Sequence, residues 1–143
     1  SLDLNLRAPF LLAQEASRKM TDGGLIVNIT DVGAQKAWSR YPSYTVSKAA
    51  LESLTKILAR ALAPKIRVNA VNPGYTMTPM QEAEYSPEML ARVNGIIPMG
   101  RHARPEELGS LYVYLASGEA AYASGAVFTL DGAESVASGA ATL

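Results

Sequence analysis

The sequence predicts an α/β fold in which a parallel β-sheet carries helices on both faces. Three short apolar segments, 25–30, 65–71 and 125–130, are expected to form strands, and helical stretches separate them. Strand–helix–strand units of this kind build parallel sheets, because the connecting helix returns the chain to the same end of the sheet. The chain of 143 residues is 48% hydrophobic with no net charge, which fits a single domain over residues 1–143 with its own core.

Two long helices are expected in the first half of the chain. Residues 1–20 place Leu6, Phe10 and Ala13 on one stripe, and "TDGG" ends this helix. The strand at 25–30 is rich in β-branched residues, as buried parallel strands are, and a loop follows it. Residues 43–63 form the clearest helix, because apolar and charged side chains occupy opposite sides. The apolar side consists of Leu51, Leu54, Leu58 and Leu62, and the charged side of Glu52, Lys56 and Arg60.

The second half is expected to contain two helices between its two strands. A short helix at 87–94 lies inside a longer excursion, 77–98, which we expect to cover the substrate as a lid. The segment 104–117 predicts a helix, because a proline stands in its first turn and two acidic residues follow. Residues 138–143 are expected to be a frayed tail.

Composition excludes several classes of function. Thirteen basic residues balance thirteen acidic ones without a block of like charge, so neither a nucleic-acid partner nor a membrane surface is indicated. No apolar run approaches the roughly 20 residues that a membrane span needs. The chain has no cysteine, which excludes disulfides and thiolate metal sites and is compatible with a cytoplasmic protein. His102, the only histidine, is expected at the surface or in a helix cap, and no metal site is predicted.

Tyr44 and Lys48 are the first candidates for catalysis. They are four residues apart on a predicted helix and therefore share one face. A phenol titrates near pH 10, roughly, and a neighbouring ammonium lowers that pKa. Tyr44 is thus a candidate general acid that Lys48 tunes, although the same spacing also fits an ordinary exposed pair. Asp31 and the Pro73-Gly74 dipeptide follow the two predicted strands nearby, and ligands bind at the carboxyl ends of such strands.

Together these motifs resemble the short-chain dehydrogenase/reductase family. The matching features are the strand before Asp31, the Y-x-x-x-K of Tyr44 and Lys48, and the P-G-x-x-x-T that follows the next strand. The resemblance runs from "NLRAPFLLAQ" to "SGAVFTLDG" and implies the C-terminal part of a Rossmann-type, doubly wound parallel sheet. It also implies NAD(P)-dependent hydride transfer on a small substrate. Dimers or tetramers of identical chains are expected to form through helices 1–20 and 43–63.

The same resemblance assigns roles to individual residues. Tyr44 would be the acid/base, and Lys48 would lower its pKa and hold the nicotinamide ribose. Asn5 matches a helix asparagine whose backbone carbonyl helps to hold a water in a proton relay. Pro9 has no N–H and would leave that carbonyl without its helical partner, although a proline that merely kinks the helix is the alternative. Further cofactor-binding residues are expected around the turn after the second strand, at Pro73, Gly74, Thr76 and Thr78.

Asp31 departs from the family, most of whose members have serine at this position. An ionised carboxylate only accepts hydrogen bonds, opposes the negative charge that develops during carbonyl reduction, and raises the pKa of Tyr44. It suits a substrate with N–H donors, such as an amino-substituted heterocycle reduced at a C=N bond. The pteridine reductases of the family carry this Asp-x12-Tyr-x3-Lys arrangement. The resemblance therefore implies NADPH-dependent reduction of a dihydropterin or folate, with NADP(H) expected rather than NAD(H).

Alternatives remain open at each of these points. Asp31 can instead anchor its own loop, with Thr30 or Ser43 supplying a hydroxyl. Trp38 and Tyr41 can stack on a flat substrate ring or pack at a surface. A carbonyl, alcohol or 3-oxoacyl reductase is the alternative enzyme, and a truncated, non-catalytic oligomerisation partner is the alternative of another class.

The sequence lacks a glycine-rich phosphate loop. Neither G-x-G-x-x-G nor the family's T-G-x-x-x-G-x-G occurs, and the family carries that loop in its N-terminal half. We therefore expect a C-terminal fragment of a chain of roughly 240–260 residues, which by itself neither binds the dinucleotide well nor turns over. A smaller departure is Ala133, where the family usually has a second glycine.

Overall fold

The structure, a computed structural model, contains a three-stranded parallel sheet and is described for residues 1–137; the predicted tail at 138–143 lies outside the described residues. The strands are β1 (Gly24–Ile29), β2 (Ile66–Pro73) and β3 (Val127–Leu130), in the order β1-β2-β3. Both pairings are parallel, with Gly24 opposite Ile66 and Ala70 opposite Val127. The predicted α/β architecture is confirmed, with strand ends within two residues of the expected ones.

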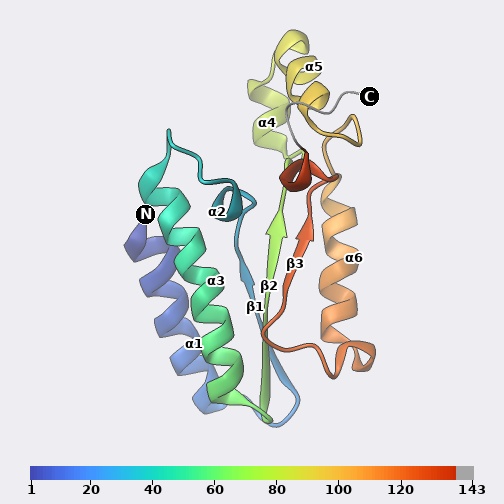
Figure 1. Cartoon of the computed structure of the whole chain (residues 1–143). Coiled ribbons are helices and arrows are strands. Elements are labelled where there is room, and N and C mark those ends of the chain that lie inside the picture. Colours follow the sequence, from blue (N-terminus) through green and yellow to red (C-terminus); the bar gives the residue numbers. More distant parts are fainter. Residues whose placement is uncertain (138–143) are drawn as a thin grey trace.

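Helices cover both faces of the sheet (Figure 1). α1 (Ala8–Lys19) and α3 (Pro42–Leu62) lie side by side against one face, and α6 (Pro105–Ala116) covers the other. β2 serves both layers, because successive side chains of a strand point to opposite faces. Val68 packs with Ala13 and Leu58 from the first pair of helices, whereas Val71 packs with Leu115 of α6. The central strand is accordingly buried along most of its length.

The chain begins with a feature that the helical pattern does not predict. A π-helical turn, η1 (Asp3–Arg7), precedes α1, and the Ala8 amide donates to the Asp3 carbonyl five residues earlier. Pro9 lies directly after this turn and supplies no N–H to the ordinary helical ladder. The predicted helix 1–20 is therefore present but opens with a wider turn.

Two further short helices lie where loops were expected. α2 (Gly33–Lys36) follows β1, and α4 (Pro79–Glu84) precedes the predicted short helix, now α5 (Pro87–Ile96). α2 is a single turn without apolar periodicity, so its helical conformation depends on contacts with the rest of the fold and is not predicted by the sequence pattern. α4 starts at Thr78, whose hydroxyl and the Gln81 side chain form a capping box. Two 3-10 turns, η2 (Gly118–Ala120) and η3 (Glu134–Val136), flank β3.

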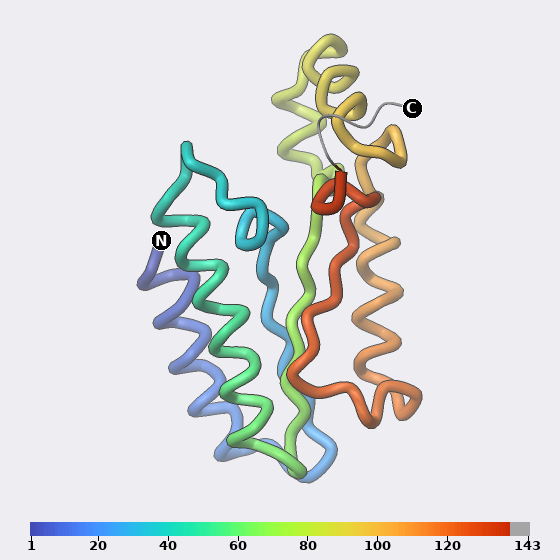
Figure 2. The backbone as a smooth tube through the Cα atoms, viewed as in Figure 1, coloured from blue at the N-terminus to red at the C-terminus, as the bar shows by residue number. Residues whose placement is uncertain are grey.

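The candidate residues gather at the carboxyl edge of the sheet. Figure 2 shows that α2 caps β1, while the chain after β2 rises beyond the sheet through α4 and α5 before α6. The N-terminus lies beside the start of α3, where Asn5 bonds to Ser47. Within residues 1–137, no helix is both long enough and apolar enough to span a membrane.

Candidate active site

Asp31 and Tyr44 are in direct contact just beyond β1. Tyr44 Oη donates a hydrogen bond to Asp31 Oδ2 at 2.8 Å, and the Gly33 amide donates to Asp31 Oδ1 at 2.7 Å. Asp31 is therefore a loop anchor and a partner of Tyr44 at once, and the two alternatives are not exclusive. Each carboxylate oxygen still has a free lone pair, so Asp31 can accept a further hydrogen bond from a ligand.

The two hydroxyls considered as substitutes for a family serine are engaged elsewhere. Thr30 is 2% exposed, and its Oγ1 donates to the Val71 carbonyl at 3.1 Å. Ser43 is exposed, and its Oγ lies 3.4 Å from the Ser1 hydroxyl. Asp31 is thus the side chain that bonds the Tyr44 phenol.

The environment of Tyr44 raises the pKa of its phenol. Burial raises the pKa of Tyr44, and the hydrogen bond to Asp31 and the negative charge of that residue raise it further. Burial lowers the pKa of Lys48, against an opposing effect of Asp31. The Lys48 ammonium lies 5.8 Å from the centre of the Tyr44 ring and donates to the Ile29 carbonyl at 2.8 Å. The lowering of the Tyr44 pKa by Lys48 that the sequence suggested is therefore outweighed.

Asn5 connects the start of the chain to the helix that carries Tyr44. Its Nδ2 donates to Ser47 Oγ at 3.1 Å, and Ser47 Oγ donates to the Tyr44 carbonyl at 2.7 Å. Ser47 is fully buried and was not singled out from the sequence, although it lies one helical turn after Tyr44. The expected role of the Asn5 carbonyl toward a water stays a prediction.

A cleft of about 470 Å³ opens beside Asp31. It gathers most of the predicted cofactor and substrate residues, together with Tyr75, Gln81 and Glu134, which sequence reasoning missed. Tyr41 is 61% exposed and lines a separate hollow with Trp38 and Tyr75. Asn5 and Lys48 line another hollow along β1, and Ile29 lines both this hollow and the cleft. The predicted residues in the cleft are Asp31, Trp38, Pro73, Gly74, Thr76 and Thr78.

The turn after β2 brings the backbone of Gly74 close to the end of β3. A Cβ on Gly74 would lie 2.7 Å from Asp131 Cα, so only glycine allows this close approach. The Ala103 amide donates to the Tyr75 carbonyl, and the Met77 amide donates to the Ala103 carbonyl, both at 2.9 Å. In this parallel bridge the N–H of Thr76 points away from Ala103 and is not used in the bridge.

Thr78 lines the same cleft, but its hydroxyl is engaged within the chain. Thr78 Oγ1 donates to Gln81 Oε1 at 3.0 Å, and the Thr78 amide donates to the same oxygen at 3.1 Å. While this cap is closed the hydroxyl can accept a hydrogen bond from a ligand but has no hydrogen left to donate. The backbone of Thr76 is therefore the better-prepared contact of the two.

His102 is buried, with 6% of its surface exposed, so the expectation of a surface position was wrong. Its Nδ1 lies 2.7 Å from Asn94 Oδ1, and its ring packs edge-on against Tyr75 and Tyr85 at 5.5 and 5.7 Å. Burial lowers the pKa of His102. The histidine thus holds α5 against the segment that follows Gly74. Among residues 1–137, no group of three or more His, Cys, Asp or Glu side chains could hold a metal ion.

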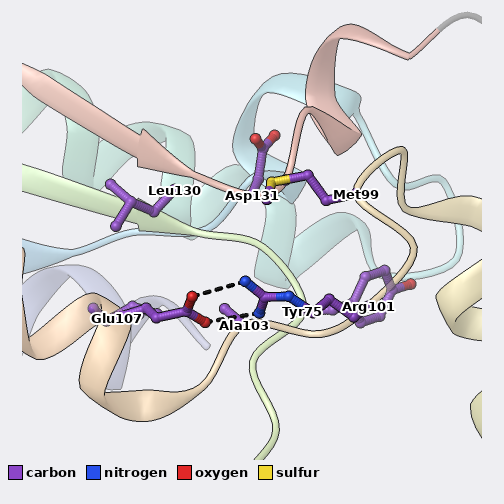
Figure 3. Close-up of a pocket in the computed structure, with 9 residues that line it drawn as sticks. Tyr75, Met99, Arg101, Ala103, Glu107, Leu130 and Asp131 are labelled. Atoms are coloured by element: carbon purple, nitrogen blue, oxygen red, sulfur yellow. Dashed lines mark hydrogen bonds and ion pairs between the residues drawn. The ribbon is translucent and has the colours of Figure 1, made fainter.

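A smaller cavity of about 170 Å³ lies near the start of α6 (Figure 3). Asp131 and Met99 flank it on one side, and Arg101 pairs with Glu107 through two hydrogen bonds of 2.8 Å on the other. Tyr75 lines both this cavity and the Asp31 cleft. Arg101, which lines this cavity, is thus already paired with Glu107.

Comparison with known proteins gives a consistent set of relatives. Residues 1–133 match the family model described as enoyl-(acyl carrier protein) reductase. A glucose and ribitol dehydrogenase from Daucus carota is 35% identical, with 90% of this chain and 44% of that protein covered. An L-xylulose reductase from Bos taurus is 36% identical, with 92% of this chain and 56% of that protein covered. An NAD-dependent glycerol dehydrogenase from Listeria innocua is 34% identical, with 92% of this chain and 53% of that protein covered. The chain spans about half the length of the curated relatives it matches.

Solved structures support the same architecture. A short-chain dehydrogenase/reductase from Brucella melitensis, described as a glucose/ribitol dehydrogenase, has a TM-score of 0.85 at 29% identity, covering 92% of this chain and 54% of that one. A short-chain dehydrogenase/reductase from Serratia marcescens has a TM-score of 0.85 at 36% identity over 94% of this chain and 55% of its own. A small-chain dehydrogenase in complex with NADPH has a TM-score of 0.85 at 27% identity over 95% and 62%. The Rossmann-type sheet expected from the sequence is confirmed.

Proposed function

The chain belongs to the short-chain dehydrogenase/reductase family of oxidoreductases, and from this premise we propose a reaction for the full protein. It interconverts an alcohol and a carbonyl on a small polyhydroxylated substrate, using a nicotinamide cofactor. The observation that carries the proposal is the 2.8 Å hydrogen bond from Tyr44 to Asp31 beside the cleft. When bound, the cofactor supplies or accepts the hydride at carbon. Tyr44 exchanges a proton with the reacting oxygen.

Asp31 suits the oxidation of an alcohol. As Tyr44 takes the alcohol proton, it passes its own proton to Asp31, to which it is already bonded, and the hydride leaves the same carbon. Reduction reverses both proton transfers. A carboxylate also accepts hydrogen bonds from neighbouring hydroxyl groups, which a polyol offers in number. The names of the relatives, which refer to glucose, ribitol, xylulose and glycerol, support this substrate class.

Reduction of a pterin-like C=N bond is the second candidate. Asp31, where most of the family has serine, can accept hydrogen bonds from the amino and ring N–H groups of such a heterocycle. Trp38 lies in the same cleft and offers a flat surface for the ring. None of the relatives reported above is named for this activity, so the polyol substrate is preferred.

For the cofactor, we propose NADP(H) rather than NAD(H). The structural relative in complex with NADPH supports this choice, although the Listeria innocua relative is named as NAD-dependent. The residues proposed for its nicotinamide end are Tyr44, Lys48, Pro73, Gly74, Thr76 and Thr78. We also propose that residues outside this chain bind the phosphates, so that these 143 residues do not turn over alone.

We further propose a homo-oligomer, a dimer or tetramer, that forms through α1 and α3. Both helices carry exposed apolar side chains, which are Phe10, Leu11, Leu12, Val46 and Ile57. The cytoplasmic location expected from the composition stays a prediction.

Turnover by the full-length protein tests the proposal. Ribitol, glycerol and xylitol would be offered with NAD⁺ and with NADP⁺, and 7,8-dihydrobiopterin with NADPH, following nicotinamide absorbance. Polyol oxidation that falls sharply in Asp31→Ser supports the proposal. Turnover of dihydrobiopterin alone transfers the function to the C=N candidate. No turnover of any substrate, with the protein folded, favours a non-catalytic partner.

A further inference from the structure

Glu134 is a buried carboxylate just beyond the C-terminal end of β3. It is 2% exposed, and its Oε1 accepts a hydrogen bond from Lys36 Nζ at 3.0 Å. Lys36 Nζ also donates to the Glu134 backbone carbonyl at 3.2 Å. Within the described part of the chain, Glu134 Oε2 has no hydrogen-bond partner, and it lies 3.2 Å from where a Cβ on Gly74 would stand.

In this ion pair the Glu134 side chain is 3% exposed, whereas the Lys36 side chain is 31% exposed. Burial removes water from the Glu134 carboxylate while Lys36 stays partly hydrated, so the pair is weak evidence for a stabilising contact. Such a pair does fix the distance between the segments it joins. Here those segments are α2, after β1, and η3, after β3, which are 98 residues apart.

The helix α2 connects this pair to Asp31. Lys36 is its last residue, and Gly33, its first, donates its amide to Asp31 Oδ1 at 2.7 Å. One helical turn is too short to be stable by itself, so contacts with the rest of the fold, α3 among them, must hold it. Asp31 provides a contact at the first end, and Glu134 provides a contact at the second.

We propose that Lys36 and Glu134 are a positioning pair that fixes α2 and thereby keeps the Asp31 carboxylate within hydrogen-bond reach of Tyr44. Neither residue need touch the substrate. The consequence for turnover rests on the proposed function, whereas the consequence for the geometry of Asp31 does not.

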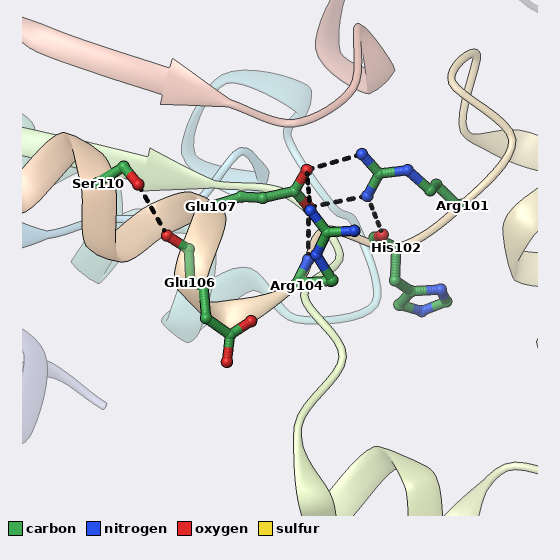
Figure 4. Close-up of polar contacts among 6 residues, drawn as sticks. All are labelled: Arg101, His102, Arg104, Glu106, Glu107 and Ser110. Atoms are coloured by element: carbon green, nitrogen blue, oxygen red, sulfur yellow. Dashed lines mark hydrogen bonds and ion pairs between the residues drawn. The ribbon is translucent and has the colours of Figure 1, made fainter.

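A second ion pair in the chain provides a matched control. Arg101 donates to Glu107, in the first turn of α6, through both terminal guanidinium nitrogens at 2.8 Å (Figure 4). This pair shares no residue with α2. Glu107→Gln therefore removes an ion pair without touching the path from Glu134 to Asp31.

The Gly33 amide reports directly on the position of Asp31. In the full-length protein, labelling with ¹³C-carbonyl valine and ¹⁵N glycine selects Val–Gly pairs, of which Val32–Gly33 is the only one in this chain. We expect hydrogen exchange of this amide to accelerate at least tenfold in Lys36→Met. Lys36→Arg, which keeps the charge and a donor, should restore slow exchange. Glu107→Gln should leave it unchanged.

Loss of the whole fold must be separated from loss of position. Lys36→Met/Glu134→Met replaces the pair by apolar side chains and leaves no unpaired charge, so this variant is expected to fold. Fast exchange at Gly33 in the folded double variant supports the positioning role. Unchanged exchange at Gly33 in that variant overturns it, whatever the turnover.

Turnover then links the pair to the chemistry. In the full-length protein, Lys36→Met/Glu134→Met should lower kcat at least tenfold with little change in KM, and have no further effect when Asp31 is already Asn. If the losses of kcat caused by Lys36→Met/Glu134→Met and by Asp31→Asn multiply when the substitutions are combined, the positioning role is contradicted. Asp31→Asn that leaves turnover unchanged would instead contradict the proposed function, and the exchange at Gly33 would still decide the positioning role.

Discussion

Two clusters of charged and polar side chains lie on either side of Tyr75. Each contains a carboxylate, and the two carboxylates have different hydrogen-bond partners. In the cleft, Asp31 accepts a hydrogen bond from the Tyr44 phenol at 2.8 Å. At the start of α6, Glu107 is surrounded by two guanidinium groups, with Arg101 at 2.8 Å and Arg104 at 3.5 Å. The first cluster contains a partner that can give up its proton, and the second does not.

The difference separates a chemical role from a structural one. Hydrogen bonds from Arg101 and from the Arg104 amide lower the pKa of Glu107 to about 2, so this carboxylate stays ionised and caps α6. Burial and Asp31 raise the pKa of Tyr44, so a proton lies between two oxygens of unequal affinity. The nature of the partner, more than the density of charge, indicates where a proton can move.

Removing the phenol is expected to have the largest effect. Tyr44→Phe deletes the group that exchanges a proton with substrate, so kcat of the full-length protein should fall by about 10²–10⁴-fold. The fold should survive, because the ring remains. Tyr114→Phe, at an exposed tyrosine of α6, is the matched control and should retain full turnover. A Tyr44→Phe protein with near-normal kcat would place the chemistry elsewhere.

Asp31→Asn tests the other half of the cleft cluster. The substitution removes a negative charge that raises the pKa of Tyr44, so that pKa should fall toward its usual value while burial still holds it up. The alkaline limb of the pH profile of kcat/KM should therefore move to lower pH. Loss of a charged hydrogen bond should also reduce kcat/KM by about 10–100-fold. An unmoved alkaline limb would mean that Asp31 does not control the phenol.

The contact between Asp31 and Tyr44 could be predicted from the order of strands and helices along the chain. Asp31 follows one strand and Tyr44 begins the next helix, and the carboxyl ends of parallel strands meet at one edge. The main helices and strands followed from periodicity, since the leucine stripe of α3 faces the sheet and Leu51 and Leu58 are buried.

What sequence reasoning missed depends on contacts between distant residues. No pattern links Lys36 to Glu134, because the two are 98 residues apart in two single-turn helices without apolar periodicity. His102 stands in a polar loop, and its burial comes from Tyr75 and Tyr85 folding over it. The cap at Thr78 was visible as a Thr-x-x-Gln pattern, but the family resemblance directed attention to a cofactor contact instead.

His102 adjoins the second cluster and should govern its stability in mild acid. Arg101 donates to the His102 carbonyl, and burial lowers the pKa of the ring, so the folded protein favours the neutral form. Its contribution to stability is present above about pH 6.5 and is lost as pH falls below that value. His102→Phe should lose about 1 kcal/mol at pH 8 with the Asn94 contact, but show less acid destabilisation. Denaturant unfolding at pH 8 and pH 5.5 measures the free energy of unfolding of both proteins. An equal loss of stability between the two pH values in the unmodified protein and in His102→Phe would contradict this role of His102.

Breaking the ion pair at α6 should leave the chemistry intact. Glu107→Gln should not change kcat, because Glu107 does not contact the cleft cluster. The folded-state pKa of about 2 lies below the usual value near 4.3, roughly, so the stabilising effect is present above that value and disappears as pH falls toward 2. Thermal melts should show a lower Tm for Glu107→Gln at pH 7, and the difference from the unmodified protein should shrink below about pH 4 and vanish at about pH 2. A loss of kcat would show that the two clusters are coupled.

The smallest effect is expected in the backbone that runs between the clusters. Ala133 has φ of 69°, a left-handed conformation that glycine adopts without strain, and its neighbour Asp131 lines the smaller cavity while Glu134 lines the cleft. Ala133→Gly should therefore raise stability by about 0.5–1 kcal/mol, after the larger entropy of the unfolded glycine is counted. Ala91→Gly, inside α5, should cost about 1 kcal/mol, because the same substitution there meets right-handed backbone. Opposite signs in the two melts would show that local backbone geometry decides the outcome, and that a strained turn at Ala133 is retained next to Glu134.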